Sequence, residues 1–405
     1  MDRAAVTPGR ALAFLAVTLV LSMSTWFSAT AVVPQLRSEW DLSRGEASWL
    51  TIAVQLGFVA GALVSSIGNV ADVLPARYVI LGGSLAAASA NLLVAGVDGP
   101  YPAIALRGLT GFCLAGVYPP AFKLMATWFQ RGRAFALGTL AGAIAVGSAA
   151  PHLVNGLGGL EWRTVVYATS ALTVLGGLVA WAFVPEGPYP FPRAVFDPRQ
   201  AGLVLRNRGV RLASLGYFGH MWELFAMWAW ILIFLRDGHG AAGTTAAYGT
   251  FGAIAVGGVA CVIAGVVAER IGRAETAAVA LAASGICALL IGLLVQAPTW
   301  IVVVALLVWG FTVIPDSALF STLVTEHAGQ AYVGTALAFQ MAIGFALTVP
   351  TIWLLPFLED QVGWRWAFAF LAPGPLLGIV AMVRLRRLVR GPLGKVHPAS
   401  SPRRA

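Results

Sequence analysis

Twelve long apolar segments follow one another along the chain, and they constrain the fold more than any other feature. An α-helix needs about 20 apolar residues to cross a bilayer. Only 11% of the residues are charged, whereas soluble proteins carry about 25%. We therefore expect an all-α membrane protein. The predicted crossings lie near residues 12–34, 46–68, 78–97, 102–126, 135–155, 164–184, 211–235, 247–268, 275–295, 300–325, 332–357 and 365–385.

A similar loop signature occurs twice, after the second and after the eighth apolar segment. The first copy is Gly68-Asn-Val-Ala-Asp72-Val-Leu-Pro-Ala-Arg77, and the second is Gly265-Val-Val-Ala-Glu269-Arg270-Ile-Gly-Arg273. In both copies a glycine precedes an acidic residue by four positions, and an arginine follows that acid. A signature repeated once per half indicates a duplicated six-helix unit.

The two halves correspond at further positions. Pro119 and Pro315 lie 196 residues apart, in the fourth and tenth segments. Both halves begin on the same side of the membrane, so we expect parallel repeats related by an axis along the membrane normal. The predicted units are an N-terminal half at 1–187, a cytoplasmic linker at 188–210, and a C-terminal half with a basic tail at 211–405.

The positive charge of the chain is distributed unevenly. The net charge is +9, and most Lys and Arg residues fall on one side of the predicted crossings. Positive residues are enriched on the cytoplasmic side of membrane proteins. We therefore expect a multi-pass protein of the plasma (inner) membrane with both termini in the cytoplasm. This distribution accounts for the charge without a nucleic-acid partner, and the basic tail is expected to contact anionic lipid in the bilayer.

The twelve segments, the central linker and the paired loops resemble the major facilitator superfamily. Arg107-Gly-Leu-Thr-Gly111 is similar to the Arg-x-x-x-Gly motif of that family. The resemblance implies that helices 1, 4, 7 and 10 line a central cavity. It also implies that helices 2, 5, 8 and 11 form the contact between the halves. The fifth segment departs from the family's glycine–proline signature around Pro151, so the direction of transport stays open.

Small residues recur at four-residue spacing in those four contact helices, with Val146 interrupting the series in the fifth segment. This spacing places them on one helix face, where they permit close helix approach. We expect these faces to form the surface between the two halves, although static packing is the alternative. The series are Ala53, Gly57, Gly61 and Ser65; Ala134, Gly138, Gly142 and Ala150; Gly249, Ala253, Gly257, Cys261 and Gly265; and Gly334, Ala338, Ala342 and Ala346.

Three ionisable residues in the predicted spans are candidates for proton coupling. Glu223 and His220 lie one turn apart in the seventh segment, and Asp316 follows Pro315 in the tenth. Ionisable groups are costly in a bilayer and usually mark functional sites there. A structural alternative is that Glu223 forms a buried network with His220. Asp316 has the alternative of binding backbone groups that Pro315 leaves free.

A second set of residues is predicted to bind substrate. Arg107 offers a counter-charge to an anion, although it has the alternative role of bracing its helix. Aromatic and amide side chains near the middle of their spans offer stacking and hydrogen bonds. The predicted set is Arg107, Trp26, Trp222, Trp228, Gln55, Gln340 and Tyr118.

The paired loops are predicted to act as a gate. The family resemblance implies that their charges pair across the cytoplasmic surface and separate when it opens. The predicted gating residues are Gly68, Asp72, Arg77, Gly265, Glu269, Arg270 and Arg273.

These observations favour a transporter over an enzyme. No nucleotide-binding loop occurs, and the three cysteines have no metal-ligand spacing, so we expect neither cofactor nor metal. We predict a monomeric, proton-coupled secondary transporter that moves a small organic solute or anion by alternating access. The alternatives are efflux of drugs or metabolites by proton antiport, and a membrane receptor that binds solute without moving it.

Overall fold

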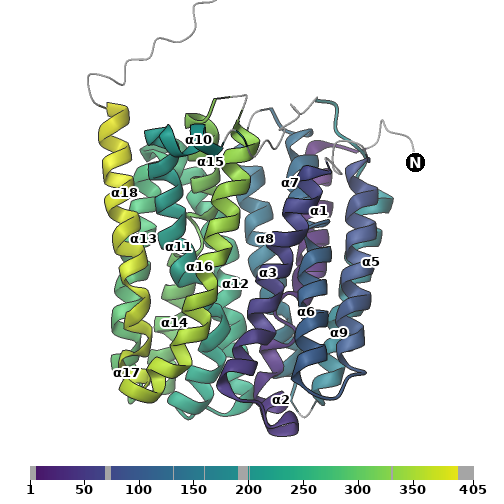
Figure 1. Ribbon diagram of the computed structural model, residues 1–405, viewed down its shortest axis with the longest axis vertical. Coiled ribbons are helices and arrows are strands. Elements are labelled where there is room, and N and C mark those ends of the chain that lie inside the picture. The colour runs from purple at the N-terminus through teal and green to yellow at the C-terminus, as the bar shows by residue number, and fades with distance from the viewer. Residues whose placement is uncertain are drawn as a thin grey trace, which may run out of the picture.

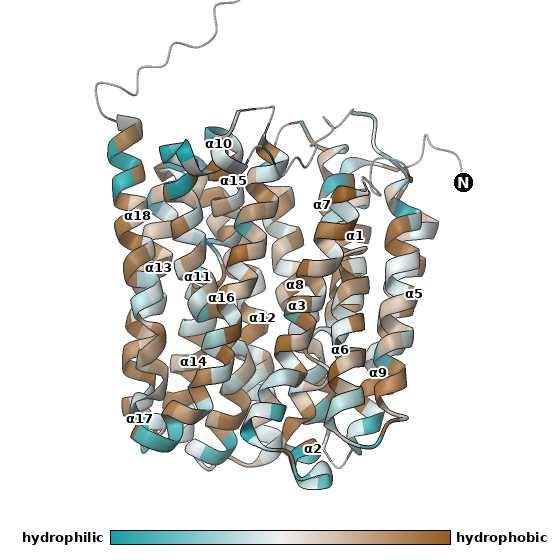
Figure 2. Ribbon diagram, in the orientation of Figure 1, coloured by the Kyte–Doolittle hydropathy of each residue, from teal (hydrophilic) through white to brown (hydrophobic). Residues whose placement is uncertain are grey.

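The computed structural model describes residues 6–68, 74–130, 132–158, 160–189, 199, 201–329 and 332–390. Within these ranges it is helical and contains no strand, which confirms the predicted fold class. Figure 1 shows the helices side by side in one bundle. Apolar residues cover most of their length and hydrophilic residues gather at the two ends (Figure 2), as expected of a bilayer-spanning protein.

The first helix group lies on the right in Figure 1. It consists of α1 (Pro8–Ser22), the 3₁₀ turns η2 (Met23–Thr25) and η3 (Thr30–Val32), α2 (Val33–Trp40), α3 (Arg44–Ile67), α5 (Ala76–Val94), α6 (Pro100–Leu114), α7 (Tyr118–Ala126), α8 (Arg133–Gly156) and α9 (Trp162–Phe183).

The short helix α10 (Ala201–Arg206) precedes the second helix group, which lies on the left. That group consists of α11 (Arg208–Ile233), the π-helical turn η5 (Phe234–Gly238), α12 (Gly243–Ile271), α13 (Arg273–Leu290), η6 (Ile291–Leu294), α14 (Thr299–Val313), α15 (Ser317–His327), α16 (Val333–Val362), α17 (Trp364–Ala367), η7 (Phe368–Leu371) and α18 (Pro373–Arg390). We call the end of the bundle that carries α10 the linker end, and the opposite end the α2 end.

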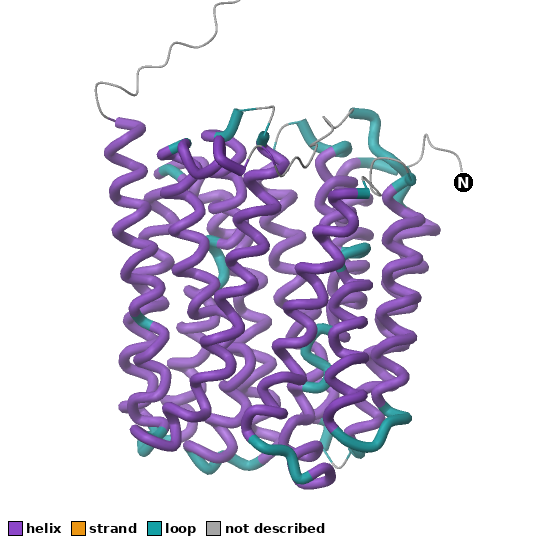
Figure 3. The backbone as a smooth tube through the Cα atoms, in the orientation of Figure 1, coloured by secondary structure: helices purple, strands orange, loops and turns teal. Residues whose placement is uncertain are grey.

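Among the described residues, eleven helical stretches are long and apolar enough to cross a membrane. The remaining predicted crossing, at 102–126, is divided into α6 and α7, which follow one another along the bundle (Figure 1). The interruption lies just before Pro119 and Pro120, whose rings cannot donate backbone hydrogen bonds. The tenth crossing is interrupted in the same way between α14 and α15, at Pro315. The paired prolines therefore mark a break in each group (Figure 3).

The two helix groups meet along two seams. In one seam α8 packs along α12, and in the other α3 packs against α16. These elements are the fifth, eighth, second and eleventh predicted crossings, so the expected contact helices are confirmed. A Cβ on Gly138 would lie 2.9 Å from the Cys261 carbonyl oxygen, and one on Gly142 would lie 2.5 Å from that of Gly258. Glycine is required here because the helix backbones touch.

Two of the small-residue series face a different neighbour from the one predicted. A Cβ on Gly57 of α3 would lie 1.9 Å from the Gly108 carbonyl oxygen on α6, within the same group. A Cβ on Gly257 of α12 would lie 2.5 Å from Ile314 Cγ2, again within the same group. The prediction that these faces of helices 2 and 8 contact the other half is therefore wrong at Gly57 and at Gly257. The adjacent Gly258 makes the contact with α8.

Replacing Gly142 by leucine should destabilise the contact between the groups. The added side chain would meet backbone atoms of α12, and overpacking of this kind costs about 1–3 kcal/mol. We expect a lower melting temperature for Gly142→Leu in detergent. Gly82→Leu is the matched control, because Gly82 lies exposed on α5 with no atom within 4 Å of a Cβ. Equal melting temperatures for the two variants would contradict the assigned seam.

Candidate transport site and gates

An aromatic cluster joins the two helix groups near the middle of the bundle. The ring of Trp26 lies 4.9 Å from that of Phe58 in the first group and 6.0 Å from that of Phe345 in the second. Phe58 and Phe345 are themselves 5.1 Å apart, and Phe225 lies 5.3 Å from Phe345. Trp26 follows directly after η2, Phe58 lies on α3, Phe345 on α16 and Phe225 on α11. The cluster therefore fills the space between the groups.

Two further predicted residues lie at the edges of this cluster. Tyr118 stacks on Phe58 with ring centroids 5.7 Å apart, and Trp228 meets Phe225 edge-on at 5.6 Å. Sequence reasoning missed Phe27, Phe58, Phe225 and Phe345 among 21 phenylalanines. For Phe58 and Phe345 a signal existed, since each lies near the middle of a predicted contact helix.

Several buried polar atoms around the cluster have no hydrogen-bond partner. They are Trp26 Nε1, Trp228 Nε1, both amide atoms of Gln55, and Gln340 Nε2. Gln55 precedes Phe58 on α3 and so lies towards the α2 end, whereas Gln340 precedes Phe345 on α16 and lies towards the linker end. Leaving such groups unpaired costs free energy. Their presence on both sides of an aromatic layer is the arrangement expected of a site that completes its hydrogen bonds with a ligand.

Trp222 does not join this group. Its Nε1 donates to the Phe370 carbonyl oxygen at 3.2 Å, and its ring lies 5.3 Å from that of Phe370. Both contacts are with η7 in the second helix group. The geometry therefore places Trp222 as a link between α11 and the last membrane helix.

Arg107 is fully buried and surrounded by neutral acceptors. Its guanidinium donates to the carbonyl oxygens of Thr25 at 2.8 Å and Leu50 at 3.4 Å, and to that of Trp26. It also donates to Asn91 Oδ1 at 3.0 Å. The carbonyls of Thr25 and Trp26 lie where the first crossing departs from α-helical geometry. Arg107 thus satisfies backbone groups that this irregular stretch leaves free, which is the bracing alternative raised by the sequence.

Glu223 is held inside the second helix group. Trp309 Nε1 on α14 donates to one carboxyl oxygen at 2.6 Å, and Ser284 Oγ on α13 donates to the other at 2.8 Å. Glu223 therefore connects helices 7, 9 and 10. His220 is not among its partners, so the proposed Glu223–His220 network is not what the structure contains.

His220 instead faces Asp316. Its Nδ1 lies 2.9 Å from Asp316 Oδ1, and both side chains are 1% exposed. The two atoms do not have the geometry of a hydrogen bond. The contact is therefore a close approach of a carboxylate and an imidazole, which carry opposite charges when His220 is protonated. The Asp316 side chain makes no capping bond to α15. The alternative in which it binds backbone freed by Pro315 is therefore not observed.

The predicted gate residues lie at the linker end without an ion pair between the groups, as far as the described residues extend. Arg273 pairs with Glu326 of its own group, and Arg77 donates to Tyr78 at 3.3 Å. Gly68, Glu269 and Arg270 are exposed at helix ends, and Gly265 is buried in α12. Asp72 lies outside the described residues.

An ion pair between the groups occurs at the α2 end. Arg44, at the start of α3, lies 2.6 Å from Glu359 and 2.5 Å from Asp360 near the end of α16. Arg44 also donates to the Pro356 carbonyl oxygen at 3.1 Å. Sequence reasoning missed this contact. Its signal was the opposite charges at the same ends of the predicted contact helices 2 and 11.

Comparison with known proteins agrees with this architecture. The sequence profile described as Major Facilitator Superfamily matches residues 14–350. The chain belongs to the Major Facilitator Superfamily. Among curated relatives, it is 27% identical over 221 residues to "Uncharacterized transporter YgaY" of Escherichia coli O157:H7, covering 51% of this chain and 54% of that protein.

Two other relatives also carry transporter names. "MFS transporter asaE" of Aspergillus flavus is 27% identical over 191 residues, covering 44% of this chain and 42% of that protein. "Gallate transporter" of Pseudomonas putida is 23% identical over 357 residues, covering 77% of each. The matches to YgaY and asaE span about half of those proteins.

Proposed function

We propose that this protein is a secondary active transporter that moves a small organic anion by alternating access, with the aromatic cluster as its binding site. The observation that carries the proposal is the set of partnerless polar atoms on Trp26, Gln55 and Gln340 around that cluster. Stacked rings hold a planar solute, and the free amide and indole groups fix its polar substituents. The position of the cluster between the helix groups supports access from either side in turn.

The proposed substrate class is an aromatic carboxylate. Aromatic side chains favour offset or edge-on contacts with another ring. A relative named "Gallate transporter" aligns over 77% of this chain, and gallate has this chemistry. We accordingly choose gallate and benzoate as first probes.

The proposed setting is the inner membrane, with the linker end in the cytoplasm. The distribution of Lys and Arg supports this orientation. We further propose that residues 1–187 and 211–405 move as two halves joined by a linker at 188–210, and that the protein acts as a monomer.

Proton coupling is proposed to use the buried acids of the second helix group. The His220–Asp316 pair links α11 to the break before α15, so its protonation state bears on the packing of two cavity-lining helices. Glu223 lies one turn from His220 and is the second candidate. Asp, Glu and His chains of this kind mark proton relays in membrane transporters.

Neutralising Asp316 should uncouple transport from the proton gradient. Asparagine cannot exchange a proton, so Asp316→Asn should lose at least about 90% of ΔpH-driven gallate uptake into proteoliposomes. A tenfold loss of rate corresponds to about 1.4 kcal/mol of activation free energy. Counterflow exchange, which needs no net proton movement, should continue. Glu223→Gln is measured in parallel. If only Glu223→Gln loses driven uptake, the coupling proton resides on Glu223 and the assignment to Asp316 is wrong.

Alternating access requires that each end of the bundle can close. We propose that Arg44, Glu359 and Asp360 close the α2 end, and that the paired loops with Asp72, Arg77, Glu269, Arg270 and Arg273 close the linker end. The Arg44 contacts join α3 to α16, so they must break when this seam separates.

Removing the Arg44 charge should increase the population that is open at the α2 end. Partly exposed ion pairs contribute about 0.2–1 kcal/mol each. Arg44 makes two of them, so Arg44→Gln should shift the open-to-closed ratio by roughly two- to thirtyfold. Spin labels are attached at Trp49 and Val362, which are both exposed. Double electron–electron resonance then measures the distance between the labels, which reports the separation of α3 and α16. Arg365→Gln, an exposed arginine at the same end, is the control. An unchanged distance distribution in Arg44→Gln would reject the latch.

The function itself is tested by binding and by uptake. Gallate at 100 times its dissociation constant should stabilise the purified protein by about 2.7 kcal/mol, and its uptake should follow ΔpH in proteoliposomes. A lipophilic cation that stabilises the protein where gallate does not would favour drug efflux. Stabilisation by gallate without uptake or exchange would indicate a receptor.

A further inference from the structure

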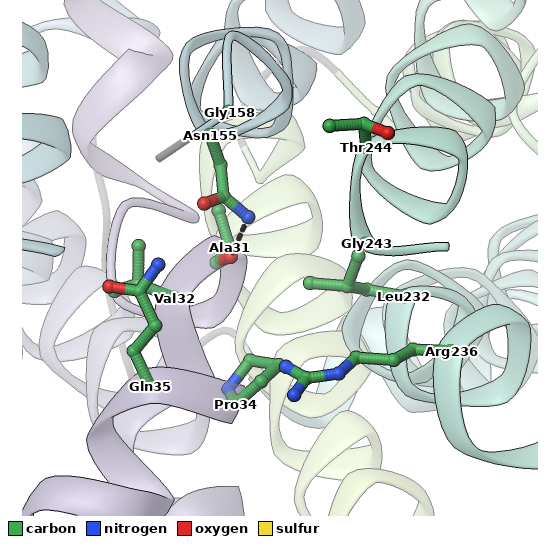
Figure 4. Close-up of a pocket in the computed structure, with 10 residues that line it drawn as sticks. All are labelled: Ala31, Val32, Pro34, Gln35, Asn155, Gly158, Leu232, Arg236, Gly243 and Thr244. Atoms are coloured by element: carbon green, nitrogen blue, oxygen red, sulfur yellow. Dashed lines mark hydrogen bonds between the residues drawn. The ribbon is translucent and has the colours of Figure 1, made fainter. Parts of the chain in front are cut away.

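A pocket of about 310 Å³ opens at the α2 end, at the corner where α2, α8, α11 and α12 meet. Figure 4 shows that its polar side chains come from both helix groups: Gln35 and Asn155 from the first, Arg236 and Thr244 from the second. Asn155 Nδ2 donates to the Ala31 carbonyl oxygen at 2.8 Å. Helices of both groups therefore line the pocket. The pocket lies at the α8–α12 seam, apart from the α3–α16 seam that Arg44 closes.

The mouth of this pocket carries a positive charge. The Arg236 side chain points towards Pro34 in Figure 4. Its ion-pair contact is with the neighbouring Asp237 at 3.7 Å, and both side chains are 47% exposed. Among the described residues that line the pocket, none is acidic. A small anion would therefore find Arg236 and uncharged polar groups here, and it would compete with the neighbouring Asp237 for the guanidinium.

A buried histidine lies one turn deeper than the pocket wall. His152 is 0% exposed, and neither ring nitrogen has a hydrogen-bond partner. On α8 it precedes the pocket residue Asn155 by three positions. It precedes Gly156, whose Cβ would touch Tyr248 of α12, by four. Residues three and four apart share a helix face, so His152 lies on the face of α8 that meets η3 and α12, one turn nearer the middle of the bundle than Asn155.

The opposite wall repeats this arrangement. Trp228 precedes the pocket residue Leu232 by one turn of α11, is 2% exposed, and has no partner for Nε1. Two buried groups that can donate hydrogen bonds thus lie one helical turn inward of residues that line the pocket, on helices from different groups. A buried polar side chain kept for structural reasons would be bonded to the protein.

We propose that this pocket is an outer binding site for a small organic carboxylate, with Arg236 at its mouth and His152 and Trp228 as its inner donors. The site is separate from the aromatic cluster and meets it only at Trp228. The proposal rests on the proposed function for its role in transport, where it would concentrate substrate before it reaches the cluster. Binding to the pocket itself does not depend on transport.

The test is equilibrium dialysis of the purified full-length protein with radiolabelled benzoate. Two classes of binding site are expected in the unmodified protein. Arg236→Gln should weaken one class by at least about tenfold, since hydrogen bonds to charged groups contribute about 1.5–3 kcal/mol. Gln55→Leu should weaken the other class. Arg365→Gln changes the charge of the same end by the same amount and should leave both classes unchanged.

His152→Leu separates a binding role from a structural one. Because the ring nitrogens bond nothing in the protein, an apolar side chain should not lower the melting temperature. The same variant should weaken the class of sites that depends on Arg236. A lower melting temperature with unchanged benzoate binding would show that His152 is structural and overturn its assignment.

The nature of the ligand is tested by competition. Benzamide, which lacks the charge, should not compete at the outer site. Displacement by inorganic phosphate or short-chain phosphatidylglycerol as strong as that by benzoate would indicate a general anion or headgroup site and overturn the carboxylate assignment. If benzoate binding is unchanged in Arg236→Gln but falls in Gln55→Leu, the outer site is wrong and the proposed function stands. Binding sensitive to Arg236 without any uptake would reject the function and keep the site.

Discussion

Inside a bilayer no water is present to satisfy a polar group, so leaving a buried polar side chain unpaired costs free energy. This constraint separates the buried polar residues into two sets. Arg107 and Glu223 have bonds to two or more neighbours each and tie helices together. Gln55 and His152 have none, although both are 0% exposed. The first set accounts for the fold. Burying the second set costs free energy that no hydrogen bond within the protein offsets. Sites with such a cost are expected to be functional.

The two helix groups share a backbone architecture but carry different buried ionisable residues. Pro119 and Pro315 interrupt equivalent helices, so the backbone retains the repeat. The buried cation Arg107 serves only the first group, where it bonds the irregular stretch around Trp26. The buried acids lie in the second group. If proton exchange occurs in the second group, the first group can act as a rigid wall against which that group repacks.

The sequence predicted the helices well and the contacts between them unevenly. Apolar length was sufficient for the crossings, and the spacing of Pro119 and Pro315 marked equivalent positions in the two halves, where the structure places the two breaks. Spacing by four correctly placed Gly138 and Gly142 on one face, but periodicity does not say which neighbour a face meets. Gly57 and Gly257 consequently face helices of their own groups. The pairing of Arg44 with Glu359 joins residues over 300 positions apart, so its only signal is the opposite charge at matching ends of two helices that the family resemblance brings together.

The two seams between the groups impose different requirements on opening. Along α8 and α12, the helix backbones touch at Gly138 and Gly142, and Gly156 packs against the Tyr248 ring. This seam is suited to act as the axis of rocking because close contacts allow little separation. Along α3 and α16, the α2 end is held by partly exposed ion pairs of Arg44. Such pairs are weak, so a ligand that prefers one state by a few kcal/mol decides the equilibrium. The outer pocket lies at the α8–α12 seam, and it can therefore receive a ligand while the Arg44 contacts between α3 and α16 are still formed.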